Sequence, residues 1–260
     1  MPDGLRVLAC VKRVPAPGAR ITLTPDGQGI DTKNLGFTTS PHEECAVEEA
    51  IRLVERHGGS STVLTLGPPE ADEQLRYAVS VGVDRAVLTA VDGPDPDAQA
   101  TARALVAAIT AEEASGGTFD LVLFGNESAD AGGFQVGIRV ARGLGRPVVT
   151  GIKGIEVDPG ARQVAARREN GDGLEVYRLE LPAVLGVKEG LNLPRYPTLP
   201  GRLRSKKAEI GQQPADAPAG GQHSLGFVLP VEQVTETTLL GTGAEAAPAV
   251  VDLLQELGLA

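Results

Sequence analysis

Hydrophobic positions recur along the chain with two different periods, and their order predicts the fold class. Short segments rich in apolar residues have the length of strands, at residues 5–11, 62–66, 85–89, 121–124 and 183–187, and the run at 121–124 is apolar throughout, as in a strand buried on both faces. The segments between them have helical spacing, at residues 40–57, 70–81, 97–113 and 134–144. Strands that alternate with helices pair in parallel through right-handed crossovers. We therefore expect an α/β protein with an open, mostly parallel, doubly wound sheet.

Residues 120–145 contain a predicted strand, a loop rich in Gly, Asp and Ser, and a segment from Phe134 with the apolar spacing of a buried helix. No acidic residue occurs between Ala131 and Leu144. The free N–H groups of such a helix start, preceded by Gly132 and Gly133, favour a phosphate. Alternatively, the glycines only ease an ordinary turn, because the loop is neither the dinucleotide fingerprint nor a P-loop with its lysine.

The helix that follows Ser40 has the opposite charge at its start. Ser40-Pro41-His42-Glu43 predicts a capping box with proline at the first helical position. Glu43 and Glu44 fill the first turn, so this helix end supplies its own anions. We expect it to bind no phosphate directly.

Outside this core the pattern changes. Residues 19–24 and 29–32 could form a hairpin around Pro25-Asp26-Gly27, and residues 148–157, 163–168 and 174–179 read as antiparallel strands separated by turn signals. Residues 211–221 are too poor in apolar side chains to pack and predict a linker. Residues 246–257 have the spacing of an amphipathic helix that needs a surface to dock on. We expect one domain over residues 1–210 and an arm over residues 211–260.

Composition and charge exclude several classes of function. The net charge is −10 without a basic tract, which argues against a nucleic-acid partner. Cys10 and Cys45 form no metal spacing and predict buried thiols in a reducing compartment. No signal peptide opens the chain and no apolar run approaches the roughly 18 residues of a membrane span. We expect a cytoplasmic protein without membrane insertion. His42, His57 and His223 pair with no nucleophile, so no catalytic set is predicted.

Several short sequences occur in the order and spacing of the electron-transfer flavoprotein beta subunit. They are Val7-Leu8-Ala9-Cys10-Val11-Lys12-Arg13, Ala46-Val47-Glu48-Glu49-Ala50, Gly67-Pro68, the loop at Gly125 with Asp130 and Gln135, Leu181-Pro182-Ala183-Val184, residues 191–200 and Lys206-Lys207. The chain resembles that family well over residues 1–210 and loosely beyond them. Residues 192–200 are the most specific part.

The resemblance implies an adenine nucleotide alpha-hydrolase-like fold and an electron carrier rather than an enzyme. In that family, alpha and beta subunits form a heterodimer. The alpha subunit holds most of the redox-active FAD, and the beta subunit usually holds a structural AMP. Electrons arrive from flavoprotein dehydrogenases and leave to a quinone reductase or another acceptor.

The resemblance also implies the cofactor-binding residues. Carried over by position, they are Ala9, Ser40, Pro41, His42, Glu43, Leu66, Gly125, Asn126, Glu127, Ser128, Ala129, Asp130, Ala131, Gly132, Gly133, Phe134, Gln135 and Val136. Ala9 is expected to lie with its backbone and small side chain beside the adenine. Asp130 and Gln135 are expected to make polar contacts, and the main-chain N–H groups from Gly132 to Val136 to hold phosphate.

The loop departs from AMP-binding relatives, which carry Asn and Thr where this chain has Phe134 and Val136. Gln135-Val136-Gly137 instead looks like relatives that bind a second FAD and bifurcate electrons. AMP is the first expectation and a second FAD the alternative. Phe134 and Val136 could also simply pack at the helix start, which suits either ligand.

The segment of residues 190–200 resembles the family's recognition loop, in which a leucine enters an apolar pocket of the partner dehydrogenase. Leu191 is the matching residue, with Arg195 and Tyr196 as further partner-binding residues. One exposed aliphatic side chain on a loop stiffened by prolines has the character of a binding hot spot. Arg195 is expected to serve the alpha subunit or the dehydrogenase through its guanidinium group. Lys206 and Lys207 fit the basic pair after the loop, or a solvated face.

The residues by themselves are also compatible with two other classes of protein. An adenine-nucleotide enzyme on a related fold needs a lysine or metal-binding acids at the phosphate loop, where this chain offers Glu127 and Asp130. A stand-alone nucleotide-binding module needs neither the recognition loop nor the arm. Copurification separates the possibilities, because only the flavoprotein is a yellow complex with a second chain.

Overall fold

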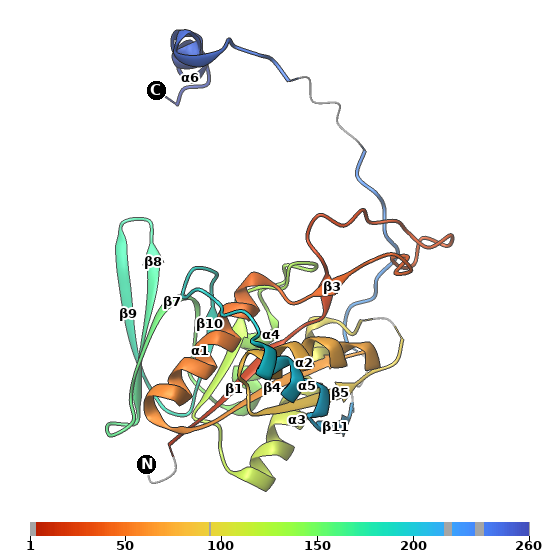
Figure 1. Cartoon of the computed structure of the whole chain (residues 1–260), viewed down its shortest axis with the longest axis vertical. Coiled ribbons are helices and arrows are strands. Elements are labelled where there is room, and N and C mark those ends of the chain that lie inside the picture. The colour runs from red at the N-terminus through yellow and green to blue at the C-terminus, as the bar shows by residue number, and fades with distance from the viewer. Residues whose placement is uncertain (1–3, 94, 216–219, 232–236, 260) are drawn as a thin grey trace. The chain divides into compact units, whose positions relative to one another are not determined.

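A single large sheet organises the chain in the computed structural model, which describes residues 4–93, 95–215, 220–231 and 237–259. Within these residues the strands run across the sheet in the order β11 (Ile210–Pro214), β5 (Arg85–Ala90), β4 (Gly59–Gly67), β1 (Leu5–Val11), β6 (Leu121–Gly125), β10 (Ala183–Val187), β7 (Val148–Asp158), β8 (Gln163–Asn170) and β9 (Gly173–Glu180). All neighbours from β11 to β7 are parallel, and β8 and β9 extend the sheet in antiparallel fashion (Figure 1). The predicted open, mostly parallel sheet with added antiparallel strands is confirmed.

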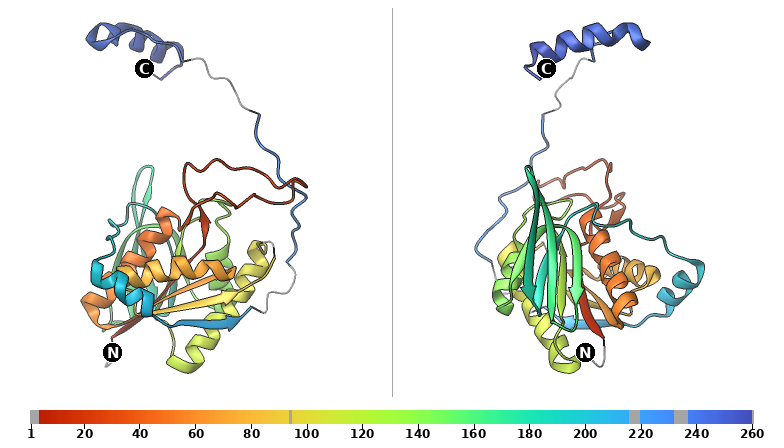
Figure 2. Two further views of the ribbon diagram at one scale, coloured as in Figure 1. Left: turned by 45° about the vertical axis from the view of Figure 1, so that its right-hand side comes forward. Right: turned by 90° about the vertical axis from the view of Figure 1, so that its left-hand side faces the viewer.

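Helices cover both faces of this sheet, as Figure 2 shows. They are α1 (Pro41–His57), α2 (Asp72–Val81) after the 3-10 turn η1 (Pro69–Ala71), α3 (Ala98–Gly116), α4 (Val136–Leu144) and α5 (Leu199–Lys207). Successive side chains of β1 point to opposite faces of the sheet, so they belong to two separate core clusters. Ala9 and its odd-numbered neighbours pack with α1 and α2, whereas Leu8 and Cys10 pack with α3 and α4. This is the doubly wound arrangement that the sequence predicts.

Helix α1 begins where the capping box is predicted. The Ser40 hydroxyl accepts a hydrogen bond from the Glu43 N–H at 3.3 Å, and the Glu43 carboxyl accepts one from the Ser40 N–H at 3.0 Å. Pro41 occupies the first helical position, and Gly58 ends the helix with a φ of 72°. Because these contacts are local, four consecutive residues suffice to place the helix start.

Helix α4 is shorter and more exposed than predicted. It begins at Val136, and of its side chains only Val140 and Ala141 are buried. Ile138 is exposed, and so is Phe134 in the loop before it. The prediction of a buried helix from Phe134 is therefore wrong. One side of α4 packs on the sheet, and its N-terminus is left open.

The segment between the short strands β2 (Val14–Pro15) and β3 (Phe37–Thr38) is mostly irregular. In place of the hairpin that residues 19–32 could form, it contains one isolated antiparallel bridge between Leu23 and Ile30. A turn hydrogen bond from the Gly27 N–H to the Thr24 carbonyl is formed at 2.9 Å. The turn residues act as predicted, but the flanking strands do not form.

The chain divides into two compact units, residues 1–226 and residues 227–260. The linker prediction is wrong for residues 211–214, because they form β11 and pair with β5. In the second unit, η2 (Gly243–Ala246) leads into helix α6 (Ala247–Glu256), as predicted, and α6 has no buried residue. Residues 216–219, 232–236 and 260 of the predicted arm lie outside the described residues.

Candidate functional site

A cavity of about 180 Å³ lies at the carboxyl ends of the central strands. Strand β1 has β4 on one side and β6 on the other, so the strand order reverses at this point of the sheet. Such a switch point is where open α/β sheets bind ligands. The cavity is lined by Cys10, Val11, Lys12, Glu43, Leu66, Gly67, Val91, Asp95, Pro96, Ala98, Thr101, Leu105, residues 124–128, Ala131, residues 133–138, Val148, Thr150, Val184 and Gly186.

The loop between β6 and α4 forms one wall of the cavity and offers free backbone donors. The N–H groups of residues 133–138 donate to no acceptor in the part of the chain that the structure describes, and α4 has neither a side-chain cap nor an acidic residue in its first turn. The Gly132 N–H is already bonded to the Ser128 carbonyl at 3.1 Å. The Gly132 N–H is thus already occupied, whereas those of residues 133–138 are free among the described residues, and a phosphate contact of this loop stays a prediction.

Phe134 has an unusual backbone at this wall. Its φ of 56° lies in the left-handed region that non-glycine residues rarely adopt. Its side chain is 52% exposed and borders the cavity, so packing in the core does not explain it. Strained backbone of this kind clusters at functional sites. The neighbouring Gln135 has its amide oxygen bound by the Arg139 guanidinium group at 2.9 Å.

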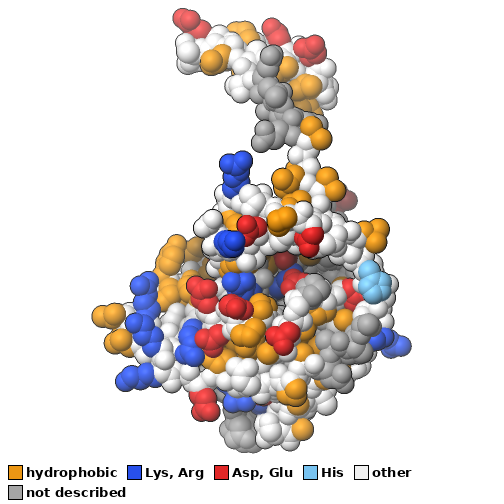
Figure 3. All heavy atoms as spheres, turned by 90° about the vertical axis from the view of Figure 1, so that its right-hand side faces the viewer, with side chains coloured by type: hydrophobic (Ala, Val, Ile, Leu, Met, Phe, Trp, Pro, Cys, Tyr) orange, Lys and Arg blue, Asp and Glu red, His pale blue; other side chains and the backbone are white. Residues whose placement is uncertain are grey.

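Lys12 joins three segments at the cavity. Its ammonium group lies 2.6 Å from an Asp130 oxygen and 2.9 Å from an Asp95 oxygen. Burial by itself lowers the pKa of Lys12, but Asp95 and Asp130 raise it above the ordinary value. The lysine is therefore charged and holds the loop before α3 against the loop before α4. Acidic side chains gather in the middle of the face drawn in Figure 3, with basic ones between them.

Glu43 is a buried carboxyl group on the cavity wall. One oxygen accepts the Lys12 N–H at 2.9 Å and the other accepts the Ser40 N–H at 3.0 Å. Burial raises the pKa of Glu43 to about 8, against the opposing effect of these N–H groups. The residue thus ties the end of β1 to the start of α1.

Several predicted site residues do not reach the cavity. Ala9 is fully buried and its side chain packs on the opposite face of the sheet, so it does not line this cavity, and its contact with a nucleotide stays a prediction. Cys10, one position later, lines the cavity instead. The other predicted residues that lie outside the lining are Ser40, Pro41, His42, Ala129, Asp130 and Gly132. Ser40, His42 and Asp130 contact the residues that form it.

His42 stands behind the cavity wall and connects two loops. Its Nε2 lies 3.3 Å from a Glu127 oxygen, and its Nδ1 accepts the Glu189 N–H at 2.8 Å. The Ser40 hydroxyl donates to the Glu127 carbonyl at 3.2 Å. The start of α1 therefore supports both the cavity loop and the segment that follows β10.

Sequence reasoning missed Lys12 and the residues from the β5–α3 loop, among them Asp95, Pro96 and Thr101. A signal was available, because Lys12 follows β1 and the β5–α3 loop follows β5. The carboxyl ends of parallel strands meet at one edge of a sheet, so both segments belong there.

The loop of residues 190–200, called the docking loop below, shows a different side-chain pattern from the predicted one. Leu191 is partly buried against the core, so the expectation of an exposed side chain is wrong there. The exposed apolar side chains are Leu193 (82%), Tyr196 (88%) and Leu199 (72%). The guanidinium group of Arg195 binds two glutamates of α1, Glu48 and Glu55.

Neither a metal-binding cluster nor a membrane-spanning helix occurs among the described residues. They contain no group of three or more His, Cys, Asp or Glu side chains arranged to hold a metal ion. None of their helices combines the length and the apolar character needed to cross a membrane.

The parallel sheet and its cavity define an α/β protein of the class that binds ligands beyond the carboxyl ends of its strands. The electron transfer flavoprotein domain matches residues 29–218. The electron transfer flavoprotein subunit beta of Bacillus subtilis is 35% identical over 235 residues, covering 87% of this chain and 89% of that protein. The human subunit beta is 34% identical over 256 residues, covering 98% of each chain.

Protein FixA of Sinorhizobium fredii is 34% identical over 208 residues, which cover 79% of this chain and 73% of that protein. The chain therefore belongs to the electron transfer flavoprotein beta subunit family. Membership gives it an electron-transfer role within a flavoprotein.

Proposed function

We propose that this chain is the beta subunit of a heterodimeric electron-transfer flavoprotein that binds AMP in the cavity and helps an alpha subunit to hold FAD. The heterodimer takes electrons from flavoprotein dehydrogenases and passes them to a quinone reductase or another acceptor. The chain itself carries electrons without a catalytic residue of its own. The buried thiols of Cys10 and Cys45 suit the reducing conditions of the cytoplasm.

The observation that carries the nucleotide proposal is the open start of α4 at the cavity wall. An adenine ring fits an apolar interior such as that formed by Leu66, Leu105 and Val184. A phosphate fits the free N–H groups of residues 133–138, where no carboxylate occupies the helix start. The capped start of α1 offers no such place, because Ser40 and Glu43 already fill it.

A second FAD in place of AMP is the alternative. It is favoured by Phe134, which presents a half-exposed aromatic ring at the cavity and suits stacking on a further ring system. The resemblance of Gln135-Val136-Gly137 to electron-bifurcating relatives agrees with it. The two ligands can be distinguished by denaturing the purified heterodimer, which would release either AMP or a second FAD.

Two surfaces support the proposed partners. The exposed Leu193, Tyr196 and Leu199 of the docking loop suit an apolar pocket of a dehydrogenase. Helix α6 exposes apolar side chains along its length, and we propose that it docks on the alpha subunit. Its exposed apolar side chains are Val250, Val251, Leu253 and Leu254, and the exposed Leu257 follows directly after the helix.

The test is to denature the purified heterodimer and to quantify the small molecules released. We expect one FAD and one AMP per heterodimer. Lys12→Gln should weaken AMP retention by about tenfold or more, because a charge-assisted contact at the cavity is lost and two aspartates remain unpaired. FAD should stay bound.

Lys33→Gln is the matched control, because Lys33 is exposed and does not line the cavity. Two FAD molecules per heterodimer would replace the AMP assignment by the alternative. A colourless chain that purifies alone and releases no nucleotide would contradict the proposal altogether.

A further inference from the structure

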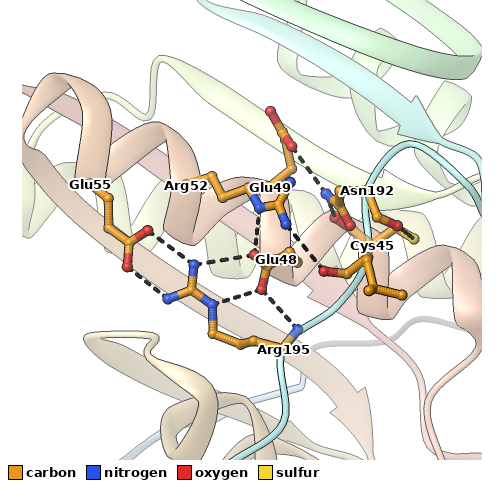
Figure 4. A network of polar contacts seen from close by, with 8 residues as sticks. Cys45, Glu48, Glu49, Arg52, Glu55, Asn192 and Arg195 are labelled. Carbon is orange, nitrogen blue, oxygen red and sulfur yellow. Dashed lines mark hydrogen bonds and ion pairs between the residues drawn. The ribbon is translucent and has the colours of Figure 1, made fainter.

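The docking loop is bound to helix α1 along most of the helix. The Asn192 amide donates to the Cys45 carbonyl and to Glu49, both at 3.0 Å. The Arg52 guanidinium group donates to the Leu193 carbonyl at 3.2 Å. Figure 4 shows the contacts that join side chains of the loop to α1. Before α5 begins at Leu199, the loop backbone is therefore held by side chains rather than by a strand or helix of its own.

Glu48 is the most buried charged residue of this contact network, with a side chain only 3% exposed. It accepts hydrogen bonds from the Arg195 Nε at 2.9 Å, the Arg195 N–H at 3.2 Å and the Arg195 Nη2 at 3.2 Å. It also pairs with Arg52 one helical turn away. A buried carboxylate is tolerated only when it is paired in this way. Glu48 thus reaches both the loop backbone and two arginines.

Arg195 has almost no capacity left for another molecule. Glu48 takes two of its guanidinium N–H groups, and Glu55 takes two more at 2.7 Å and 3.0 Å. A guanidinium group has five N–H donors in all. With Arg195 and Asn192 bound to α1, the neighbouring apolar residues Leu193 and Tyr196 are left exposed.

We propose that Glu48 is the positioning residue of the docking loop, and that Arg195 acts through Glu48 rather than by touching the partner. This inference rests on the docking function proposed above. Its physical content is preorganisation: a loop already held in one conformation loses less freedom when a partner binds. Glu48 makes no contact with the partner itself.

Hydrogen exchange in the purified heterodimer, without a dehydrogenase, tests the positioning role. Glu48→Gln keeps the side-chain volume and removes the charge. We expect amide exchange over residues 190–200 to become about tenfold faster or more, because hydrogen bonds to a charged group are lost. Arg195→Lys, which cannot bind both glutamates in a fork, should give a smaller increase.

Glu112→Gln is the matched control. Glu112 is also a buried glutamate bound by an arginine, Arg85, but it lies on α3 and outside the docking loop. It should leave exchange over residues 190–200 unchanged. Equal exchange in Glu48→Gln and the wild type would overturn the proposal.

Association with a dehydrogenase at varied salt separates positioning from direct contact. If Arg195 acts through Glu48, Arg195→Lys and Glu48→Gln weaken binding without additivity and leave the salt dependence of the association rate unchanged. Additive losses, or a change in salt dependence with Arg195→Lys, would overturn the inference. Faster loop exchange with unaltered electron transfer would instead contradict the docking function on which it rests.

Discussion

Glu43 is expected to make the free energy of unfolding depend on pH, and Glu43→Gln to remove that dependence. The carboxyl group is 6% exposed, and burial raises its pKa from 4.5 to about 8. Between these two pH values the folded chain holds a proton that the unfolded chain has released. Stability from this group is therefore complete below pH 4.5 and is lost as the pH rises toward 8.

The structure sets the size of the effect. A pKa difference between 4.5 and about 8, at about 1.4 kcal/mol per pH unit, corresponds to roughly 5 kcal/mol over the whole window. Both Glu43 oxygens accept backbone N–H groups. A glutamine amide can accept only one of these bonds, so the variant should be about 1 kcal/mol less stable at pH 5. It should become more stable than the wild type before pH 8.5, and the two stability curves should cross.

Urea unfolding of both chains in the same state of assembly, from pH 5 to pH 8.5, measures the difference. Glu55→Gln is the control. Hydrogen bonding to Arg195 lowers the pKa of Glu55, so the stability that Glu55 contributes is lost only as the pH falls below 4.5. Its difference from the wild type should stay constant in this range. A Glu43→Gln difference that is flat, or that falls as the pH rises, would show an ionised carboxylate in the folded chain and refute the reasoning.

Two further predictions concern the partner surfaces. We expect slower reduction by the dehydrogenase, with unchanged flavin content and stability, when either exposed leucine is shortened in Leu193→Ala or Leu199→Ala. Leu191→Ala should instead cost about 1–2 kcal/mol of stability, because this side chain packs against the core. Stopped-flow reduction and urea unfolding measure the two effects, and a slower reduction from Leu191→Ala alone would restore Leu191 as the anchor. Truncation after Gly226 should release the alpha subunit, because it removes the exposed apolar side chains of α6. If gel filtration still shows an intact heterodimer, α6 does not dock on the alpha subunit in the way proposed.

The parts of the site that depend on local sequence were predictable. The capping box of Ser40 and Glu43 needs only neighbouring residues, and it formed as predicted. The run of residues 121–124 is apolar throughout because its strand is buried on both faces. The loop that follows it was therefore placed at the carboxyl edge of the sheet, where the cavity lies.

In strands that are apolar on both faces, the sequence does not show which side chains point to which face of the sheet. In β1, Ala9 and Cys10 are both apolar, so no alternation shows which of them faces the cavity. Strand β11 was missed because Gln212 and Gln213 carry no apolar signal; pairing with β5 at the sheet edge makes the strand. Leu191 and Leu193 likewise look alike in sequence, and contacts between the docking loop and α1 separate them.

The sequence by itself determined the order of the main strands and helices between residues 40 and 187, the start of α1 and the family, because periodicity, capping and short motifs act over a few neighbouring residues. Only the tertiary structure decided the pairing of Lys12 with Asp95 and Asp130. It alone also decided the burial of Glu48 beneath the docking loop. These contacts join segments far apart in the chain, so they exist only once the sheet has brought its strand ends together.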